Sequence, residues 1–436
     1  MRILSLALAA SALSAVIPVP LHAQRNDGVV DCGTNLCNAT VLRPIAEKLV
    51  ARKPVRILVI GDSHTAGDMY TDGLRQRLVA DYGSSGRGVV TGGRPYRGYL
   101  TWGINALQSQ GWSINGYFGN IWREGGPAVG LSGYTKTANS AGESLSLTAE
   151  APEYTFDTFI LCGTAQPGGG TVSVKMGALD TTVSFNAPVR RAICQRFTAE
   201  RRVEFVSVTT LDAGTVSITS MGTFRSTGSG ISISNLGVPS SQLVHFARTD
   251  SDTLIRELEA YQLDMIVLAY GTNEGFNADL DLATYEQQLR DTIFRLKMMT
   301  TANVPMMLLG PPNAMTRNAA IAHAGPLPPV TCDTGIMVPG NIAGVRAIQR
   351  RVANVMGLAF WDWGRAMGGP CAMWQWRAEG LTAADAVHIN RPGGIRLGAI
   401  LASDFENALA TAMSFKPGMG SASDRAAPPS SVITIP

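Results

Sequence analysis

The chain has 436 residues, of which 45% are hydrophobic and 16% are charged. This composition excludes wholesale disorder, because so long and apolar a chain can bury a large core. Lys and Arg number 36 against 33 Asp and Glu, a formal net charge of +3 with no strongly basic or acidic block. That balance excludes the basic surface expected of a nucleic-acid-binding protein, and the length predicts about two, at most three, domains.

Residues 1–23 have the order of a secretory signal peptide. Arg2 supplies a positive start, residues 3–17 are mostly apolar, and residues 19–23 end on the small Ala23. A membrane anchor is the alternative interpretation, although the apolar run is short for a span of the bilayer. No other stretch approaches the ~18 uninterrupted apolar residues of a membrane helix. We therefore expect an exported mature chain, periplasmic or secreted, without an integral membrane span.

The six cysteines agree with export, because they are even in number and form no CxxC pair of the kind that holds zinc. Many pairings of six cysteines are open at this point. Proximity in the sequence and grouping by domain favour Cys32–Cys37, Cys162–Cys194 and Cys332–Cys371.

Short apolar runs alternate with helical patterns at the start and in the second half of the chain. The first part predicts a helix at 41–52, a buried strand at 55–60 and a helix at 68–82. The second part predicts strands at 264–270, 305–310 and 358–362, and helices at 282–296, 345–355 and 394–413. Such alternation predicts a parallel sheet with helices on both faces.

The intervening stretch is rich in Gly, Ser and Thr and shows the two-residue periodicity of half-buried strands, for example at 171–176, 203–208 and 215–218. Short strands separated by turns predict a β-sandwich. We therefore expect an all-β sandwich at 95–228, inserted into one α/β domain made of residues 40–94 and 229–415. Residues 416–436 are expected to form a disordered tail.

A serine follows the first buried strand directly, in Gly61-Asp62-Ser63-His64. The carboxyl ends of parallel strands are where open α/β sheets place their ligands, and a serine at a helix start has an outward-facing N–H. Ser63 is therefore a candidate nucleophile. The alternative is that Ser63 only caps the following helix.

Asp385 and His388 lie three residues apart, just before the last predicted helix. A serine hydrolase needs an imidazole base and a carboxylate that orients it, and one loop can supply both groups. A surface histidine without a role is the alternative.

Two further strand ends carry candidate oxyanion donors. Asn273 has a side-chain amide, and Gly237 has no side chain to block access to its N–H. Together with the Ser63 N–H they predict an oxyanion hole, although for each of them alone a strand-end turn is the favoured interpretation.

Serine, glycine, asparagine and Asp-x-x-His, each at a strand end and in this order, resemble the four blocks of the SGNH (GDSL-like) hydrolase superfamily. The segments 61–68, 235–237, 271–274 and 361–369 resemble in particular the peptidoglycan O-acetylesterases. The resemblance implies a secreted serine esterase with a three-layer α/β fold and an inserted sandwich similar to a carbohydrate-binding module. Ser63, Asp385 and His388 would be catalytic, and the substrate would be the acetyl ester on muramoyl O6. The chain departs from many superfamily members at Glu274, where they have Asp, and lacks the aromatic residue that often follows Gly394.

Several other sequence features do not indicate a phosphate, metal or sugar-binding site. The glycines at 168–170 open no helix and precede no Lys-Ser/Thr, so we expect a turn and not a phosphate loop. No cluster has metal-ligand spacing, and we expect neither metal nor cofactor. A hydrophobic core is the favoured interpretation, over a sugar-stacking surface, for five aromatic residues: Trp102, Trp112, Tyr117, Phe118 and Trp122.

The sequence therefore predicts a monomeric, exported esterase that acts on O-acetylated peptidoglycan or a related acetylated glycan through an acetyl-serine intermediate. An O-acetyltransferase, or an esterase for another polysaccharide, would use the same residues. A wall-binding protein without activity is the alternative from another class.

Overall fold

A six-stranded sheet forms the centre of the α/β part of the chain. The computed structural model describes residues 32–300 and 303–414, so the predicted signal peptide and tail lie outside the described residues. The strand order is β1-β19-β16-β15-β2-β14, and all neighbours are parallel except the edge strand β1. The strands span β1 (Leu36–Cys37), β2 (Pro54–Gly61), β14 (Gly230–Gly237), β15 (Met265–Ala269), β16 (Met306–Leu309) and β19 (Ala359–Trp361).

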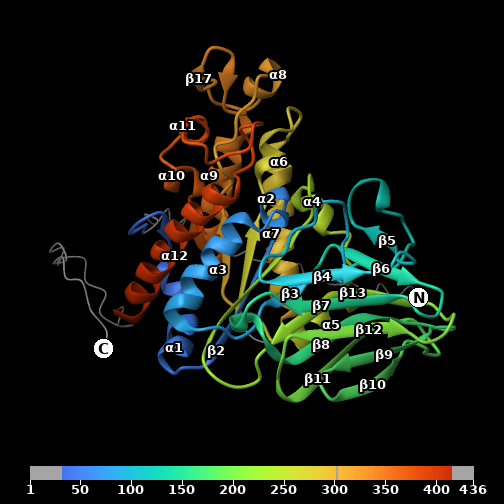
Figure 1. Cartoon of the computed structure of the whole chain (residues 1–436). Coiled ribbons are helices and arrows are strands. Elements are labelled where there is room, and N and C mark those ends of the chain that lie inside the picture. Colours follow the sequence, from blue (N-terminus) through green and yellow to red (C-terminus); the bar gives the residue numbers. More distant parts are fainter. Residues whose placement is uncertain (1–31, 301–302, 415–436) are drawn as a thin grey trace, which may run out of the picture. The chain divides into compact units, whose positions relative to one another are not determined.

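Side chains alternate between the two faces of this sheet, and both faces are apolar. Ile57 and Val59 of β2 point to the face that carries Tyr70, Leu74 and the last helix, while the intervening residues of β2 are buried on the other side. The first face is covered by α1 (Arg43–Val50), α3 (Met69–Tyr82) and α12 (Arg391–Ser414), as Figure 1 shows.

The direction of the crossovers reverses at β2. The chain passes from β2 through α3 to β14 in one direction, and from β14 through α5 (Ser251–Tyr261) to β15 in the other. It continues in that second direction through α7 (Leu282–Met299) to β16 and through α9 (Asn341–Met356) to β19. Because such crossovers are right-handed, the reversal places α3 on one face and α5, α7 and α9 on the other. It also makes the end of β2 a topological switch point, where open α/β sheets bind ligands.

Short elements complete this part of the chain. They are η1 (Ala39–Leu42), α2 (Ser63–Ala66), α4 (Leu243–Phe246), α6 (Thr272–Gly275), α8 (Ala319–Ala322), β17 (Thr331–Asp333), β18 (Ile336–Met337), α10 (Trp363–Ala366) and α11 (Ala372–Ala378). No helix within 32–300 or 303–414 is long and apolar enough to cross a membrane.

The predicted insert is a β-sandwich of two antiparallel sheets around a separate apolar core. One sheet has the order β10-β9-β12-β7-β4, with β4 (Ile104–Gln108), β7 (Ser144–Ala149), β9 (Thr171–Met176), β10 (Leu179–Ser184) and β12 (Phe205–Thr210). The other has the order β11-β8-β13-β6-β5, with β5 (Ser113–Gly116), β6 (Tyr134–Ala138), β8 (Phe156–Ala165), β11 (Arg191–Val203) and β13 (Val216–Phe224). The 3-10 turns η2 (Gly119–Ile121) and η3 (Pro152–Tyr154) lie between these strands in the sequence.

One strand of the sandwich sheet lies outside the range predicted for the insert. β3 (Gly88–Val90) precedes residue 95, yet it pairs with β13 and not with the parallel sheet. The insert is therefore held at its base by a strand that the sequence assigns to the α/β part.

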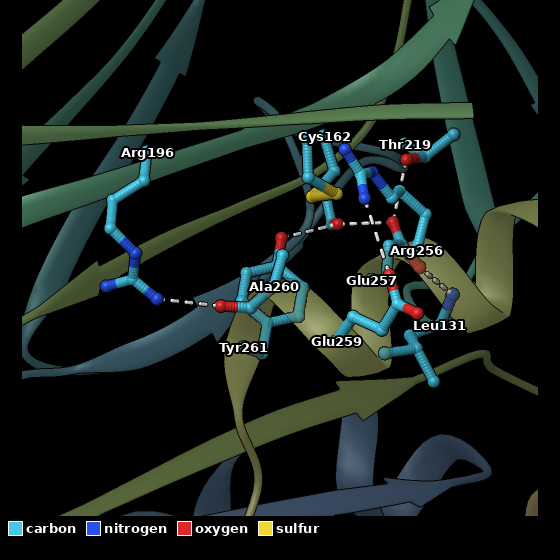
Figure 2. The surroundings of a disulfide bond; sticks show 11 residues. Leu131, Cys162, Arg196, Thr219, Arg256, Glu257, Glu259, Ala260 and Tyr261 are labelled. Atoms are coloured by element: carbon cyan, nitrogen blue, oxygen red, sulfur yellow. Dashed lines mark hydrogen bonds and ion pairs between the residues drawn. A yellow bond between two sulfur atoms is a disulfide. The ribbon is translucent and has the colours of Figure 1, made fainter. Parts of the chain in front are cut away.

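The sandwich packs against α5 through a buried carboxylate, shown with its surroundings in Figure 2. Glu257 of α5 accepts hydrogen bonds from the Thr219 hydroxyl at 2.7 Å, from the Leu131 N–H at 2.6 Å and from the Ser220 hydroxyl. Burial raises the pKa of Glu257, and these hydrogen bonds only partly offset that effect. The α/β part and the insert thus share a polar contact with no access to solvent.

The three disulfides of the described chain are the predicted pairs Cys32–Cys37, Cys162–Cys194 and Cys332–Cys371. Cys162–Cys194 joins β8 to β11 within the sandwich, and Figure 2 is centred on it. Disulfides are consistent with an oxidising compartment outside the cytoplasm.

The core interpretation of the five aromatic residues holds for only some of them. Trp112 and Tyr117 are 6% and 1% exposed. Trp102, Phe118 and Trp122 are only half-buried, so a core position was the wrong expectation for these three. Their side chains reach the surface because they lie in connections between strands, where the two-residue alternation of a strand does not apply.

Candidate active site

The turn after β2 presents the candidate nucleophile. β2 ends at Gly61, and Asp62 caps α2 by accepting a hydrogen bond from the His64 N–H at 3.0 Å. A Cβ at position 61 would lie 2.5 Å from the Ala269 carbonyl oxygen of the neighbouring strand, so the close approach requires glycine. Ser63 is therefore the first residue of a helix at the switch point of the sheet, and it is only partly buried.

The predicted base and carboxylate meet Ser63 from the loop before α12. Ser63 Oγ lies 2.8 Å from His388 Nε2, and His388 Nδ1 lies 2.7 Å from an Asp385 oxygen. With its proton on Nδ1, the ring donates to Asp385 and accepts from Ser63. The other Asp385 oxygen accepts from the Val387 and His388 backbone N–H groups at 2.9 and 3.0 Å. Partial burial tends to raise the pKa of Asp385, but the hydrogen bonds from His388 and Val387 outweigh it, so the pKa is lowered and the carboxylate stays charged.

Gly237 packs directly on the turn that carries Ser63. It ends β14 and lies opposite Gly61 in the parallel register. A Cβ at this position would lie 2.1 Å from the Ala66 nitrogen and 2.6 Å from the Asp62 carbonyl oxygen. Only a glycine lets α2 approach β14 this closely.

Asn273 lies on the other side of β2, in α6 after β15. Its side-chain amide donates to the Ser241 carbonyl at 2.9 Å, which leaves its second N–H available. Its backbone carbonyl accepts from the Gln242 side chain at 3.1 Å. The strands β14, β2 and β15 are neighbours, so Gly237, Ser63 and Asn273 emerge at the same edge of the sheet.

A second Asp–His pair, which was not predicted from the sequence, lies next to the first. His64 Nδ1 lies 3.3 Å from Asp62 Oδ1, and His64 Nε2 lies 3.0 Å from the Val387 carbonyl oxygen. The His64 ring also stacks on His388, with centroids 5.0 Å apart. Burial lowers the pKa of His64, but the hydrogen bond to Asp62 and its charge outweigh that effect and raise the pKa. His64 thus anchors the loop that carries His388. Its position next to Ser63 in the sequence motif was the one signal that could have pointed to it.

Glu274 is buried behind Asn273. One of its oxygens accepts from the Leu243 N–H at 2.7 Å, and the other is buried without a hydrogen-bond partner. Burial raises the pKa of Glu274 to about 7, although the backbone hydrogen bond acts in the opposite direction. The glutamate is therefore half-protonated near neutral pH and ties α6 to the segment before α4.

A buried ion cluster contacts the turn that carries Ser63. Asp68 accepts from Arg75 at 2.8 Å and from Arg87 at 2.9 Å. Arg87 also donates to the Asn235 side chain at 2.6 Å, and Asn235 donates to the Thr65 carbonyl of α2 at 3.2 Å. All four side chains are buried, and the buried carboxylate of Asp72, 3.3 Å from Arg75, supplies the second negative charge that offsets the two guanidinium groups.

Within the described ranges, no three His, Cys, Asp or Glu side chains are grouped so as to hold a metal ion.

A solved peptidoglycan O-acetylesterase superimposes on this chain with a TM-score of 0.70, covering 87% of this chain and 100% of the other at 24% identity. This is the SGNH hydrolase fold. The predicted fold class, an SGNH three-layer parallel sheet with an inserted all-β sandwich, is therefore confirmed.

Two other solved structures match this chain with low TM-scores. A lipase/acylhydrolase from Enterococcus faecalis is 18% identical, with a TM-score of 0.29, over 44% of this chain and 80% of its own. A family two carbohydrate esterase from Cellvibrio japonicus is 10% identical, with a TM-score of 0.27, over 70% of this chain and 98% of its own. No protein-family model and no curated protein matches the sequence.

Proposed function

We propose that the chain is an exported serine esterase that removes O-acetyl groups from peptidoglycan, with muramoyl O6 as the acetylated position. The observation that carries the proposal is the Ser63–His388–Asp385 relay at the switch point of the sheet. The likeness in fold to a peptidoglycan O-acetylesterase supports the choice of substrate. The three disulfides support export.

The first half of the reaction forms an acetyl-enzyme. His388 Nε2 takes the proton of Ser63 as Oγ attacks the acetyl carbonyl carbon, and Asp385 stabilises the imidazolium that results. The tetrahedral oxyanion is held by the Ser63 and Gly237 N–H groups and by the free N–H of the Asn273 side chain. The imidazolium then gives its proton to the sugar oxygen, which leaves as an alcohol.

The second half releases acetate. His388 takes a proton from water, the hydroxide attacks the acetyl-serine, and Ser63 recovers its proton as the intermediate collapses. The base lies in a loop at the surface, with 41% of the His388 side chain and 48% of the Asp385 side chain exposed, so water has direct access to it. This exposure favours hydrolysis over transfer to a second sugar.

The test is acetate release from O-acetylated peptidoglycan and from a small aryl acetate. Ser63→Ala should lower kcat on both substrates by about 10⁴-fold or more while the far-UV circular dichroism stays unchanged. Ser113→Ala is the matched control, because Ser113 is an exposed serine of the sandwich that donates only to the Thr137 carbonyl.

Retention of more than about a tenth of the activity by Ser63→Ala would remove Ser63 from the mechanism, given the loss expected of a nucleophile. Transfer of the acetyl group to an added glycan acceptor, in preference to water, would show a transferase. Binding of peptidoglycan without release of acetate from either substrate would show a wall-binding protein.

A further inference from the structure

Two aromatic side chains of the insert reach the surface beside the α/β part. Phe118 and Trp122 flank the short turn η2, one on each side, and both are half-buried. The segment that carries them follows β5 and faces α4. We call Phe118, Trp122 and the neighbouring Arg248 the aromatic ledge.

The ledge is linked to the candidate active site through Gln242. The Gln242 side chain donates to the Asn273 carbonyl at 3.1 Å, and the Gln242 N–H donates to His245 Nδ1 at 2.9 Å. The His245 ring in turn packs on Phe118, with centroids 4.5 Å apart. A chain of direct contacts therefore runs from the proposed oxyanion donor Asn273 to the ledge.

The rings of the ledge are held in place before any ligand binds. The Arg248 guanidinium lies 4.2 Å from the centre of the Trp122 ring and donates to the Tyr117 carbonyl at 3.0 Å. Tyr117 itself is buried, and its hydroxyl lies 2.8 Å from that of Tyr270, which follows β15 just before the Asn273 turn. The segment that presents the ledge is thus anchored in the core next to the site.

From these contacts we propose that the aromatic ledge is a binding surface for the glycan strand of the acetylated substrate, next to the sugar whose ester is cleaved. The inference rests on the proposed function for the identity of the strand. It assigns to the insert a direct part in holding the polymer, while the reacting groups all come from the α/β part.

The chemistry of the ledge fits an acidic glycopolymer. The axial C–H groups of pyranose rings pack on aromatic faces, and rings fixed in advance lose little conformational entropy on binding. Arg248 is exposed, and no carboxylate of the described ranges pairs with it. Peptidoglycan carries carboxylates on its stem peptides, so its charge complements that of Arg248.

The decisive measurement compares polymer with small substrate in Trp122→Ala and Arg248→Gln. For each, kcat/KM on O-acetylated peptidoglycan should fall about tenfold, mainly through KM, while kcat/KM on a small aryl acetate changes less than about twofold. Phe205→Ala is the matched control, because Phe205 is an aromatic residue of the same insert, 48% exposed, in the opposite sheet. It should change neither value.

Binding is measured separately from chemistry by co-sedimentation of the Ser63→Ala protein with O-acetylated and with chemically deacetylated sacculi. Adding Trp122→Ala should weaken sedimentation on both preparations, because the ledge contacts the sugars and not the acetyl group. Equal sedimentation with and without Trp122, or an equal loss of activity on polymer and aryl acetate, would overturn the proposal that the aromatic ledge binds the glycan strand.

These outcomes are distinct from failure of the proposed function. If the wild-type protein released no acetate from peptidoglycan, the activity would be misassigned. The sedimentation arm would still report whether Trp122 and Arg248 hold a glycan strand.

Discussion

Glu274→Gln should change how the stability of the protein depends on pH. Burial raises the pKa of Glu274 from 4.5 to about 7 in the folded protein. The folded protein therefore binds this proton more tightly than the unfolded chain does, and unfolding releases it between pH 4.5 and about 7. The stabilisation that the folded protein gains from protonated Glu274 is fully present below pH 4.5 and is lost as the pH rises towards 7. The free energy of unfolding therefore falls over this range.

The size of the effect follows from the shift. The folded and unfolded values differ by about 2.5 pKa units, which corresponds to about 3 kcal/mol lost from low pH to neutral pH and above. Glutamine is a neutral isostere that can still accept from the Leu243 N–H, and it does not ionise. Relative to wild type, the variant should gain up to about 3 kcal/mol between pH 4.5 and pH 8.

Urea unfolding followed by circular dichroism at pH 5, 6, 7 and 8 measures this difference directly. The wild-type protein is its own reference, because every other titrating group is common to both proteins. Glu379→Gln is a control at an exposed glutamate that pairs only with Arg396. A difference between wild type and Glu274→Gln that stays constant from pH 5 to pH 8 would refute the account of the buried carboxyl.

Three further predictions concern the site and the insert. Asp385→Asn should lower kcat by about 10⁴-fold without unfolding the protein, because the imidazole loses its orienting charge; steady-state kinetics and circular dichroism check this together. Gly237→Ala should destabilise the fold by about 1–3 kcal/mol and lower activity, because its Cβ would overlap the Ala66 nitrogen; a thermal melt that matches wild type would contradict that packing. Replacing residues 95–228 by a Gly/Ser linker should lower the melting temperature, because Glu257 loses its hydrogen-bond donors. The folded fraction should keep its turnover of aryl acetate and lose its activity on the polymer. An equal loss on both substrates would show that the insert takes part in the chemistry.

The strand ends of the α/β part were accessible from the sequence because each motif directly follows an apolar run. Parallel strands end at one edge, so residues far apart in the chain meet there once the runs are recognised as strands. This is why the sequence could bring Ser63, Gly237 and Asn273 together. The Asp385–His388 loop followed from the chemical need for a base and a carboxylate.

Contacts that depend on packing between distant segments were not accessible. The burial of Glu274, the contact of His64 with the loop of His388, and the pairing of β3 with β13 have no periodic signature. The partial exposure of Phe118 and Trp122 could not be predicted either. In a connection between strands, the sequence does not show whether an aromatic side chain enters the core or reaches the surface.

The pairing of β3 with β13 bears on the order in which this chain can fold. β2 and β14 are neighbours in the parallel sheet, but the whole insert is synthesised between them, so their direct pairing closes a very long loop. β3 and β13 pair antiparallel, with Val90 opposite Met221, and this brings the two ends of the insert side by side. Once the sandwich has folded, the loop that β14 must close consists only of the short segments on either side of that pair, which lowers the entropic cost by about 1 kcal/mol. Folding of the insert therefore favours the pairing of β14 with β2, which places Gly237 beside the Ser63 turn, although the insert contributes no residue to that pair of strands.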